Sequence, residues 1–258
     1  MSVLEPLAAR YAYWLGLPAS DMTATALPEA PGPSRPDEVQ AMPVILRLEK
    51  AKPPARTPLL EAAASAALAV CLDERALPGG EWHEAVRSWV SGHIRKVTRR
   101  ARGVHWVTAQ EFPGVTVTVA GAEVRALVPG RVLDVPKEIA RLQISGSDLP
   151  PDEPGPAPDD MPLLLVNPEV TMTVGKAAAQ VGHATMILAA LLRDAELAAW
   201  AARGYACAVR TPSVARWTAL HPGDDPAAAW RARRVVAVRD AGFTEVEPGT
   251  VTVLAQWR

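Results

Sequence analysis

The chain has 258 residues, enough for two domains that each bury a hydrophobic core. Lysine and arginine total 27 and aspartate and glutamate total 28, so bulk charge argues neither for nor against a nucleic-acid partner. The two cysteines have no metal-ligand spacing, and no stretch approaches the ~20 apolar residues of a spanning helix, so we expect a soluble, cytoplasmic protein.

The first half of the chain alternates expected structure with proline-rich breaks. Residues 1–17 have the apolar stripe of a short amphipathic helix. Four prolines then fall within residues 28–36, which predicts a linker. A buried strand over 43–48 and a helix over 59–72 follow. Five prolines and four acidic residues in 149–161 predict a domain boundary.

These breaks divide the chain into four parts. We predict an N-terminal helix and proline-rich extension in residues 1–40, a first lobe in 41–148, a linker in 149–161 and a second lobe in 162–258.

The second lobe has a regular alternation of apolar strands and alanine-rich helices. We predict strands at 162–166, 205–210, 234–239 and 250–257, and helices or helical turns at 175–192, 194–203, 213–219 and 226–232. The connection between the last two strands is too short for a crossover, so that pair is antiparallel and the sheet is mixed. The expected fold class is α/β, with helices on both faces of a small mixed sheet.

An internal repeat extends this prediction to the first lobe. Trp89 and Trp106 lie 17 residues apart, as do Trp200 and Trp217, so one offset of 111 residues relates both pairs. The same offset places Val124-Arg125-Ala126-Leu127 on Val235-Val236-Ala237-Val238. We therefore expect two α/β/α three-layer lobes of one ancestral fold.

The segment Thr173–Thr185 carries an unusual polar row on an otherwise apolar helix. Lys176, Gln180 and His183 are spaced i, i+4 and i+7, which places them on one helix face. The start of a helix attracts anions through its unpaired amides and its dipole, and a lysine in the first turn adds a full positive charge. The neighbouring residues do not complete a P-loop, which excludes that type of nucleotide hydrolysis.

A second polar cluster directly follows the apolar strand that ends near Arg239. Asp240 stands at the strand end, and Thr244, Thr250 and Thr252 supply hydroxyl groups nearby. Loops at strand ends are where α/β folds carry reactive groups.

At these two stretches the sequence resembles the peptidyl-tRNA hydrolase PTH2 family, over about residues 161–258. The motifs read Gly175-Lys176-Ala177-Ala178-Ala179-Gln180-Val181-Gly182-His183-Ala184, Asp240-Ala241-Gly242-Phe243-Thr244 and Pro248-Gly249-Thr250. The resemblance implies hydrolysis of the ester between a peptide and the 3′ ribose of tRNA, with no metal or organic cofactor.

Carried over by position, the resemblance implies Lys176, Asp240 and Thr244 as catalytic residues. It assigns the substrate site to Gly175, Gln180, His183, Thr250 and Thr252, of which Thr252 is a further catalytic candidate. Two assignments stay open: Asp240 activates water while Lys176 holds the oxyanion or the terminal phosphate, or Lys176 keeps Asp240 ionised while Thr244 positions the water.

The chain departs from the family pattern where basic residues are usual, because Val174 and Phe243 stand there. A dense basic run in the first lobe offers replacement charge for the tRNA backbone, at Arg95, Lys96, Arg99, Arg100 and Arg102. A solvated face, or the protection of an edge strand, is the competing interpretation.

The first lobe is expected to be catalytically inert. With the offset of 111, Pro129 stands where Asp240 does and Leu133 where Thr244 does. Because family members pair as homodimers, we predict a monomeric pseudo-dimer with one active site, with a homodimer as the alternative. The alternative functions are a non-catalytic tRNA- or ribosome-binding module and a hydrolase of another aminoacyl-tRNA ester.

Overall fold

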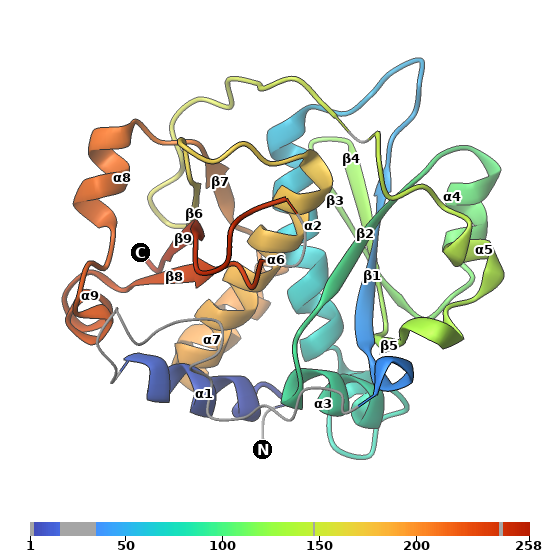
Figure 1. Ribbon diagram of the computed structural model, residues 1–258, viewed down its shortest axis with the longest axis horizontal. Coiled ribbons are helices and arrows are strands. Elements are labelled where there is room, and N and C mark those ends of the chain that lie inside the picture. Colours follow the sequence, from blue (N-terminus) through green and yellow to red (C-terminus); the bar gives the residue numbers. More distant parts are fainter. Residues whose placement is uncertain (1–2, 16–34, 147, 243–244) are drawn as a thin grey trace.

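Two β-sheets lie on either side of a central pair of helices (Figure 1). The computed structural model describes residues 3–15, 35–146, 148–242 and 245–258. The first part of the chain forms α1 (Glu5–Leu15), η2 (Pro36–Glu38), β1 (Gln40–Arg47), α2 (Arg56–Leu72), η3 (Glu74–Ala76), α3 (His83–Ser91), β2 (Lys96–Ala101), α4 (Val104–Ala109), β3 (Gly114–Val119), β4 (Ala122–Leu127), β5 (Gly130–Arg131), η4 (Val132–Asp134) and α5 (Lys137–Ala140). The second part forms β6 (Leu163–Val166), α6 (Val174–Leu191), α7 (Asp194–Ala201), β7 (Ala208–Arg210), α8 (Val214–Leu220), α9 (Pro226–Arg233), β8 (Val235–Arg239) and β9 (Val251–Gln256).

The two sheets have the same strand order. The first runs β2-β1-β4-β3, with β5 added to one end of β1, and the second runs β7-β6-β9-β8. In each sheet the first strand pairs parallel with the second and antiparallel with the fourth, and the third and fourth are antiparallel. The predicted mixed sheet and the predicted α/β fold class with two lobes are confirmed.

Alternation along the strands separates the layers. Leu164 and Val166 of β6 face the core between the sheets, whereas Leu163 and Leu165 pack on the outer face with Trp217 of α8. In the first sheet, Ile45 faces outward towards the residues of α4 and α5. Each sheet is therefore covered by helices on both faces, with α2 and α6 packed together between the sheets.

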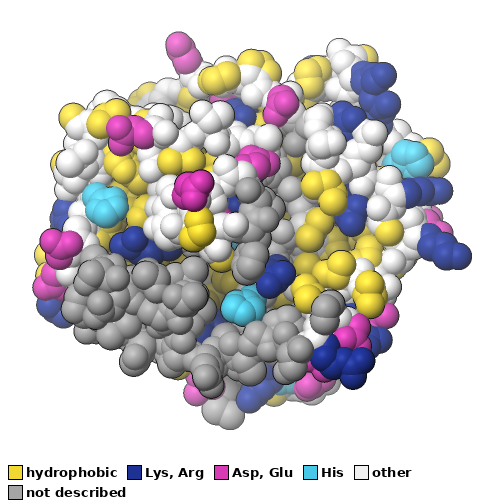
Figure 2. All heavy atoms as spheres, viewed as in Figure 1, with side chains coloured by type: hydrophobic (Ala, Val, Ile, Leu, Met, Phe, Trp, Pro, Cys, Tyr) yellow, Lys and Arg dark blue, Asp and Glu magenta, His cyan; other side chains and the backbone are white. Residues whose placement is uncertain are grey.

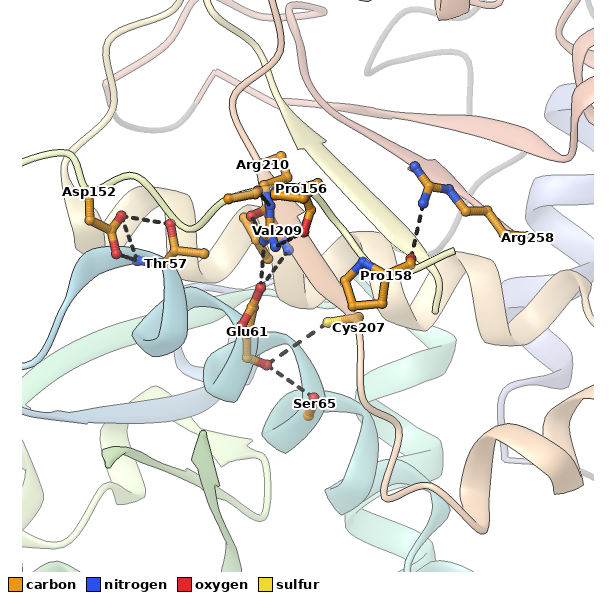
Figure 3. A network of polar contacts seen from close by, with 11 residues as sticks. Thr57, Glu61, Ser65, Asp152, Pro156, Pro158, Cys207, Val209, Arg210 and Arg258 are labelled. Atoms are coloured by element: carbon orange, nitrogen blue, oxygen red, sulfur yellow. Dashed lines mark hydrogen bonds and ion pairs between the residues drawn. The ribbon is translucent and has the colours of Figure 1, made fainter. Parts of the chain in front are cut away.

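The two lobes are also joined by polar contacts at the edge strand β7 (Figure 3). Glu61 of α2 accepts hydrogen bonds from the backbone N–H of Val209 at 3.0 Å and from the Arg210 guanidinium at 2.9 Å. Asp152, in the proline-rich segment, accepts from both the backbone N–H and the hydroxyl group of Thr57 at the start of α2. A carboxylate from the first lobe thus satisfies an edge N–H of the second sheet, which blocks pairing with another strand.

The predicted repeat holds for the tryptophans. Trp89 donates its indole N–H to the carbonyl oxygen of Arg95, and Trp200 donates to that of Ala206, six residues on in both cases. Trp106 and Trp217 each lie on the outer face of their own sheet.

The offset of 111 residues is wrong for the strands, where it related residues 124–127 to residues 235–238. It places β4 on β8, but β4 is the strand beside β1, which makes it the counterpart of β9. The counterpart of β8 is β3, so Pro129 and Leu133 do not correspond to Asp240 and Thr244. The offset fails because α9 lies between α8 and β8, whereas only residues 110–113 separate α4 from β3. The longer loop between β8 and β9 then adds to the shift, since the β3–β4 turn holds only Ala120 and Gly121.

Helix α1 lies within the predicted helix over residues 1–17, and it contacts both lobes. Leu4, Leu7 and Tyr11 are buried in the core between the sheets. The Tyr11 hydroxyl donates to the carbonyl oxygen of Ala237 in β8, and Arg10 donates to the carbonyl oxygens of Val90 and Ser91 after α3. Within the described part of the chain, no helix is long and apolar enough to span a membrane.

Candidate active site

The first turn of α6 meets the loop that follows β8. The Thr173 hydroxyl caps the helix by accepting from the backbone N–H of Lys176, as its sequence position predicted. The ammonium group of Lys176 then forms an ion pair with Asp240, whose side chain is 4% exposed. These residues are 64 positions apart, and the sequence singled out both.

Two further buried side chains fix the carboxylate of Asp240. Gln180, one turn after Lys176, donates its amide N–H to Oδ2 of Asp240 at 2.8 Å. The Gln180 amide is itself oriented, because the hydroxyl of Thr252 in β9 donates to its Oε1 at 2.5 Å. Gln180, Asp240 and Thr252 are all buried, so the chain of contacts is shielded from water.

The backbone of the loop completes this arrangement. The N–H of Gly242 donates to Oδ1 of Asp240 at 2.8 Å. Gly242 has a φ of +78°, and a Cβ there would lie 2.3 Å from Pro248, so a larger residue would displace the loop. Glu245 accepts from both the N–H and the hydroxyl group of Thr173, which ties the loop to the start of α6. Thr244, predicted as catalytic, lies outside the described residues.

Thr250 and Gly175 lie close to this network. The carbonyl oxygen of Thr250 accepts from the N–H of Asp240 at 2.9 Å, so Thr250 closes the loop through its backbone. Gly175 is buried in the first turn of α6 and lines the same cavity as Lys176.

His183 lies two turns after Lys176 and contacts the other lobe. Its Nδ1 is 3.1 Å from the amine nitrogen of Lys96 at the start of β2. Burial, followed by the positive charges of Lys96 and Lys176, holds the pKa of His183 well below its ordinary value, so the imidazole is neutral. Burial also lowers the pKa of Lys96 to about 7.

The site opens into a cavity of about 570 Å³ between the lobes. The wall from the second lobe includes Lys176, Gln180, His183 and Asp240. The wall from the first lobe includes apolar side chains, among them Ile94, Val97, Val132 and Ile144. In Figure 2, hydrophobic, basic and histidine side chains meet near the middle of the face, where α6 and β2 run side by side in Figure 1. A substrate in this cavity would touch both lobes.

The basic residues at 95–102 have different surroundings in the structure. Arg99 donates to the carbonyl oxygens of Ala140 and Leu142, and Arg100 donates to that of Gly146, so both hold the segment after α5. Lys96 lines the cavity and Arg102 is exposed. Arg95 also lines the cavity.

Comparison with known families agrees with this geometry. Residues 162–256 match the family Peptidyl-tRNA hydrolase PTH2. This region contains Lys176, Gln180, His183, Asp240 and Thr252, so the family recognised from the two motifs is confirmed for the C-terminal lobe. No curated protein and no solved structure matches the chain. Within the described residues, no group of three or more His, Cys, Asp and Glu side chains is arranged to hold a metal ion.

Two contacts of the site were not predicted from the sequence. The first is the hydrogen bond between Thr173 and Glu245, which joins the two motifs. It could have been predicted, because Glu245 directly follows the second motif. The second is the contact of Lys96 with His183, which could not have been predicted from local patterns, because only the packing of β2 on α6 brings these residues together.

Proposed function

We propose that the second lobe hydrolyses the ester that joins a peptide, or another N-blocked aminoacyl group, to the 3′ ribose of tRNA. The observation that carries this proposal is the buried Lys176–Asp240 ion pair at the start of α6, which opens into the cavity between the lobes. The match of residues 162–256 to the PTH2 family supports the same reaction.

Asp240 is suited to orient the attacking water. An ionised carboxylate has about four lone-pair positions. Among the described residues, Lys176 and Gln180 donate to Oδ2 and Gly242 donates to Oδ1, which leaves one acceptor position on Oδ1. A water held there attacks the ester carbonyl carbon, and its proton passes, directly or by way of Asp240, to the departing 3′ oxygen.

Lys176 is suited to stabilise the charge that develops. The tetrahedral intermediate carries a negative oxygen, and the ammonium group and the amides at the start of α6 supply positive potential in a partly buried site. Collapse of the intermediate breaks the bond between the carbonyl carbon and the 3′ oxygen, releasing the peptide acid and tRNA. Thr244 remains a proposed contributor to water positioning.

The first lobe is proposed to be non-catalytic. Its two-residue β3–β4 turn leaves no loop equivalent to residues 240–250. Helix α2, whose sequence is RTPLLEAAASAALAVCL, contains no lysine, glutamine or histidine to match the polar row of α6. Both halves of the catalytic arrangement are therefore missing from the position where the repeat would place them.

An assay of ester cleavage tests the proposed function. N-acetylaminoacyl-tRNA and free aminoacyl-tRNA are compared as substrates for the wild type, Lys176→Ala and Asp240→Ala. We expect the wild type to release the N-blocked group preferentially and both variants to lose this activity. Release of neither group by the wild type, with retained tRNA binding, would instead indicate a binding module.

The exposed Arg102 is proposed to contact the tRNA backbone. Arg102→Gln should reduce the dependence of log Kd on log salt by about one unit, as expected for one lost phosphate contact. Arg102 is the informative position because Arg99 and Arg100 also hold the segment after α5. An unchanged salt slope would remove Arg102 from the tRNA site.

A further inference from the structure

Lys96 crosses the boundary between the lobes. It is the first residue of β2 in the first sheet, yet its amine nitrogen lies 3.1 Å from Nδ1 of His183 and 3.2 Å from the sulfur of Met186, both on α6. The amine is also 5.1 Å from the centroid of the Trp89 ring. A residue of the non-catalytic lobe thus reaches the polar row of the catalytic helix.

The surface of α6 accommodates this side chain. A Cβ at Gly182 would lie 3.0 Å from Cε of Lys96 and 3.0 Å from Cβ of Ala67 in α2. Glycine at this position therefore leaves room both for the aliphatic part of Lys96 and for the close approach of the two helices. The side chain of Lys96 therefore passes close to the backbone of α6 at Gly182, with its amine beside the Trp89 ring.

The contact determines which nitrogen of His183 carries the proton. Below its pKa of about 7, Lys96 is an ammonium group with three donors and no acceptor, so the Nδ1 atom that faces it accepts. The neutral ring then carries its proton on Nε2. No residue that the structure describes accepts a hydrogen bond from Nε2, and His183 lines the cavity together with Lys176.

We propose that Lys96 is a positioning residue of the active site, which holds the His183 imidazole in the Nε2–H tautomer so that this N–H donates to the substrate in the cavity. The role in substrate binding rests on the proposed hydrolysis of peptidyl-tRNA. The first lobe therefore completes the active site of the second, in addition to covering its apolar surface.

The histidine ring provides a direct test in the full-length protein. Nitrogen-15 NMR of the imidazole groups, with His183 assigned through His183→Gln, is compared for the wild type, Lys96→Met and Lys137→Met. Lys137 is an exposed lysine of the same lobe and controls for the lost charge. At pH 6.5 we expect the Nε2–H tautomer in the wild type and in Lys137→Met, and a mixture with the Nδ1–H tautomer in Lys96→Met.

The titration of the same ring adds a second readout. Lys96 and Lys176 are the positive groups that act on His183, so removing Lys96 should let the ring protonate at a higher pH than in the wild type. An unchanged tautomer and titration in a folded Lys96→Met variant would overturn the proposal. If Lys96→Met does not fold, Lys96→Arg is used instead, because arginine keeps a cationic donor. This variant should retain the Nε2–H tautomer, and loss of that tautomer in Lys96→Arg would also overturn the proposal.

Kinetics then test whether Lys96 acts through His183. We expect Lys96→Met alone to lower kcat/KM for N-acetylaminoacyl-tRNA about tenfold relative to the wild type, as expected for one lost hydrogen bond. Added to His183→Gln, the same substitution should have no further effect on kcat/KM. Fully additive losses would contradict action through His183. The NMR results do not depend on catalysis, so failure of the proposed hydrolase function would be distinguishable from failure of this positioning role.

Discussion

Thr185 of α6 donates its hydroxyl group to the carbonyl oxygen of Ala64 in α2, at 2.9 Å, in the centre of the interface between the lobes. Thr185 is fully buried and Ala64 is one of many alanines on α2 that pack there. Small side chains allow the two helices to approach closely, so each helix buries the apolar face of the other. The two lobes therefore stabilise each other as the subunits of a dimer would.

Separation of the lobes should expose this face. A fragment of residues 158–258 lacks α2, and we expect it to form dimers or larger species in size-exclusion chromatography with light scattering. The full-length chain, in which α2 already covers α6, should be monomeric under the same conditions. A monomeric, well-folded fragment would contradict the pseudo-dimer.

The contact of Glu61 with β7 should contribute to stability. In Glu61→Ala, the N–H of Val209 and the guanidinium group of Arg210 lose their shared acceptor in a region where the ion pair is only 15–17% exposed. We expect the free energy of unfolding to fall by about 1.5–3 kcal/mol, measured by urea denaturation. Glu74→Ala, at an exposed position of the same lobe, is the control, and equal effects of the two substitutions would show that the contact adds nothing.

Stability should depend on pH through Lys96. Burial lowers its pKa to about 7 in the folded protein, whereas the unfolded chain has the ordinary value of about 10.4. Between these values the unfolded state binds more protons, so this residue makes the free energy of unfolding rise with pH; below pH 7 its destabilising effect is fully present. The nearby thiol of Cys71, whose pKa burial raises to about 12, stays neutral over this range.

Lys96→Met removes this dependence. Relative to the wild type, the variant should gain more stability at pH 7 than at pH 9.5, measured by urea denaturation at several pH values. Lys137→Met should show a constant difference from the wild type. A pH-independent difference for Lys96→Met would contradict the lowered pKa.

The sequence predicted much of the second lobe because each element there has an uninterrupted pattern. The predicted helix over 175–192 is α6 at Val174–Leu191, and the predicted strand over 234–239 is β8 at Val235–Arg239. The resemblance to the PTH2 family also implied that Lys176 and Asp240 share one site, and the structure brings their side chains together as an ion pair.

The relationship between the lobes was harder to predict. The offset of 111 follows the tryptophans, whose indole contacts repeat, but the additional helix α9 before β8 changes the offset for the strands that come later. Likewise, nothing in the sequence around Lys96 indicates that it meets His183. That contact depends on long-range packing of β2 against α6, which local patterns do not encode.

The rate of N-acetylaminoacyl-tRNA hydrolysis by Asp240→Asn tests the central claim most directly. Asparagine keeps the shape of the side chain but removes the negative charge that pairs with Lys176. It also replaces one carboxylate oxygen with an NH2 group, which cannot accept the hydrogen bonds of Lys176 and Gln180 or take a proton from water. We expect kcat to fall by roughly 10²–10⁴-fold, with tRNA affinity unchanged. Hydrolysis at the wild-type rate would show that the Lys176–Asp240 pair is not the catalytic centre.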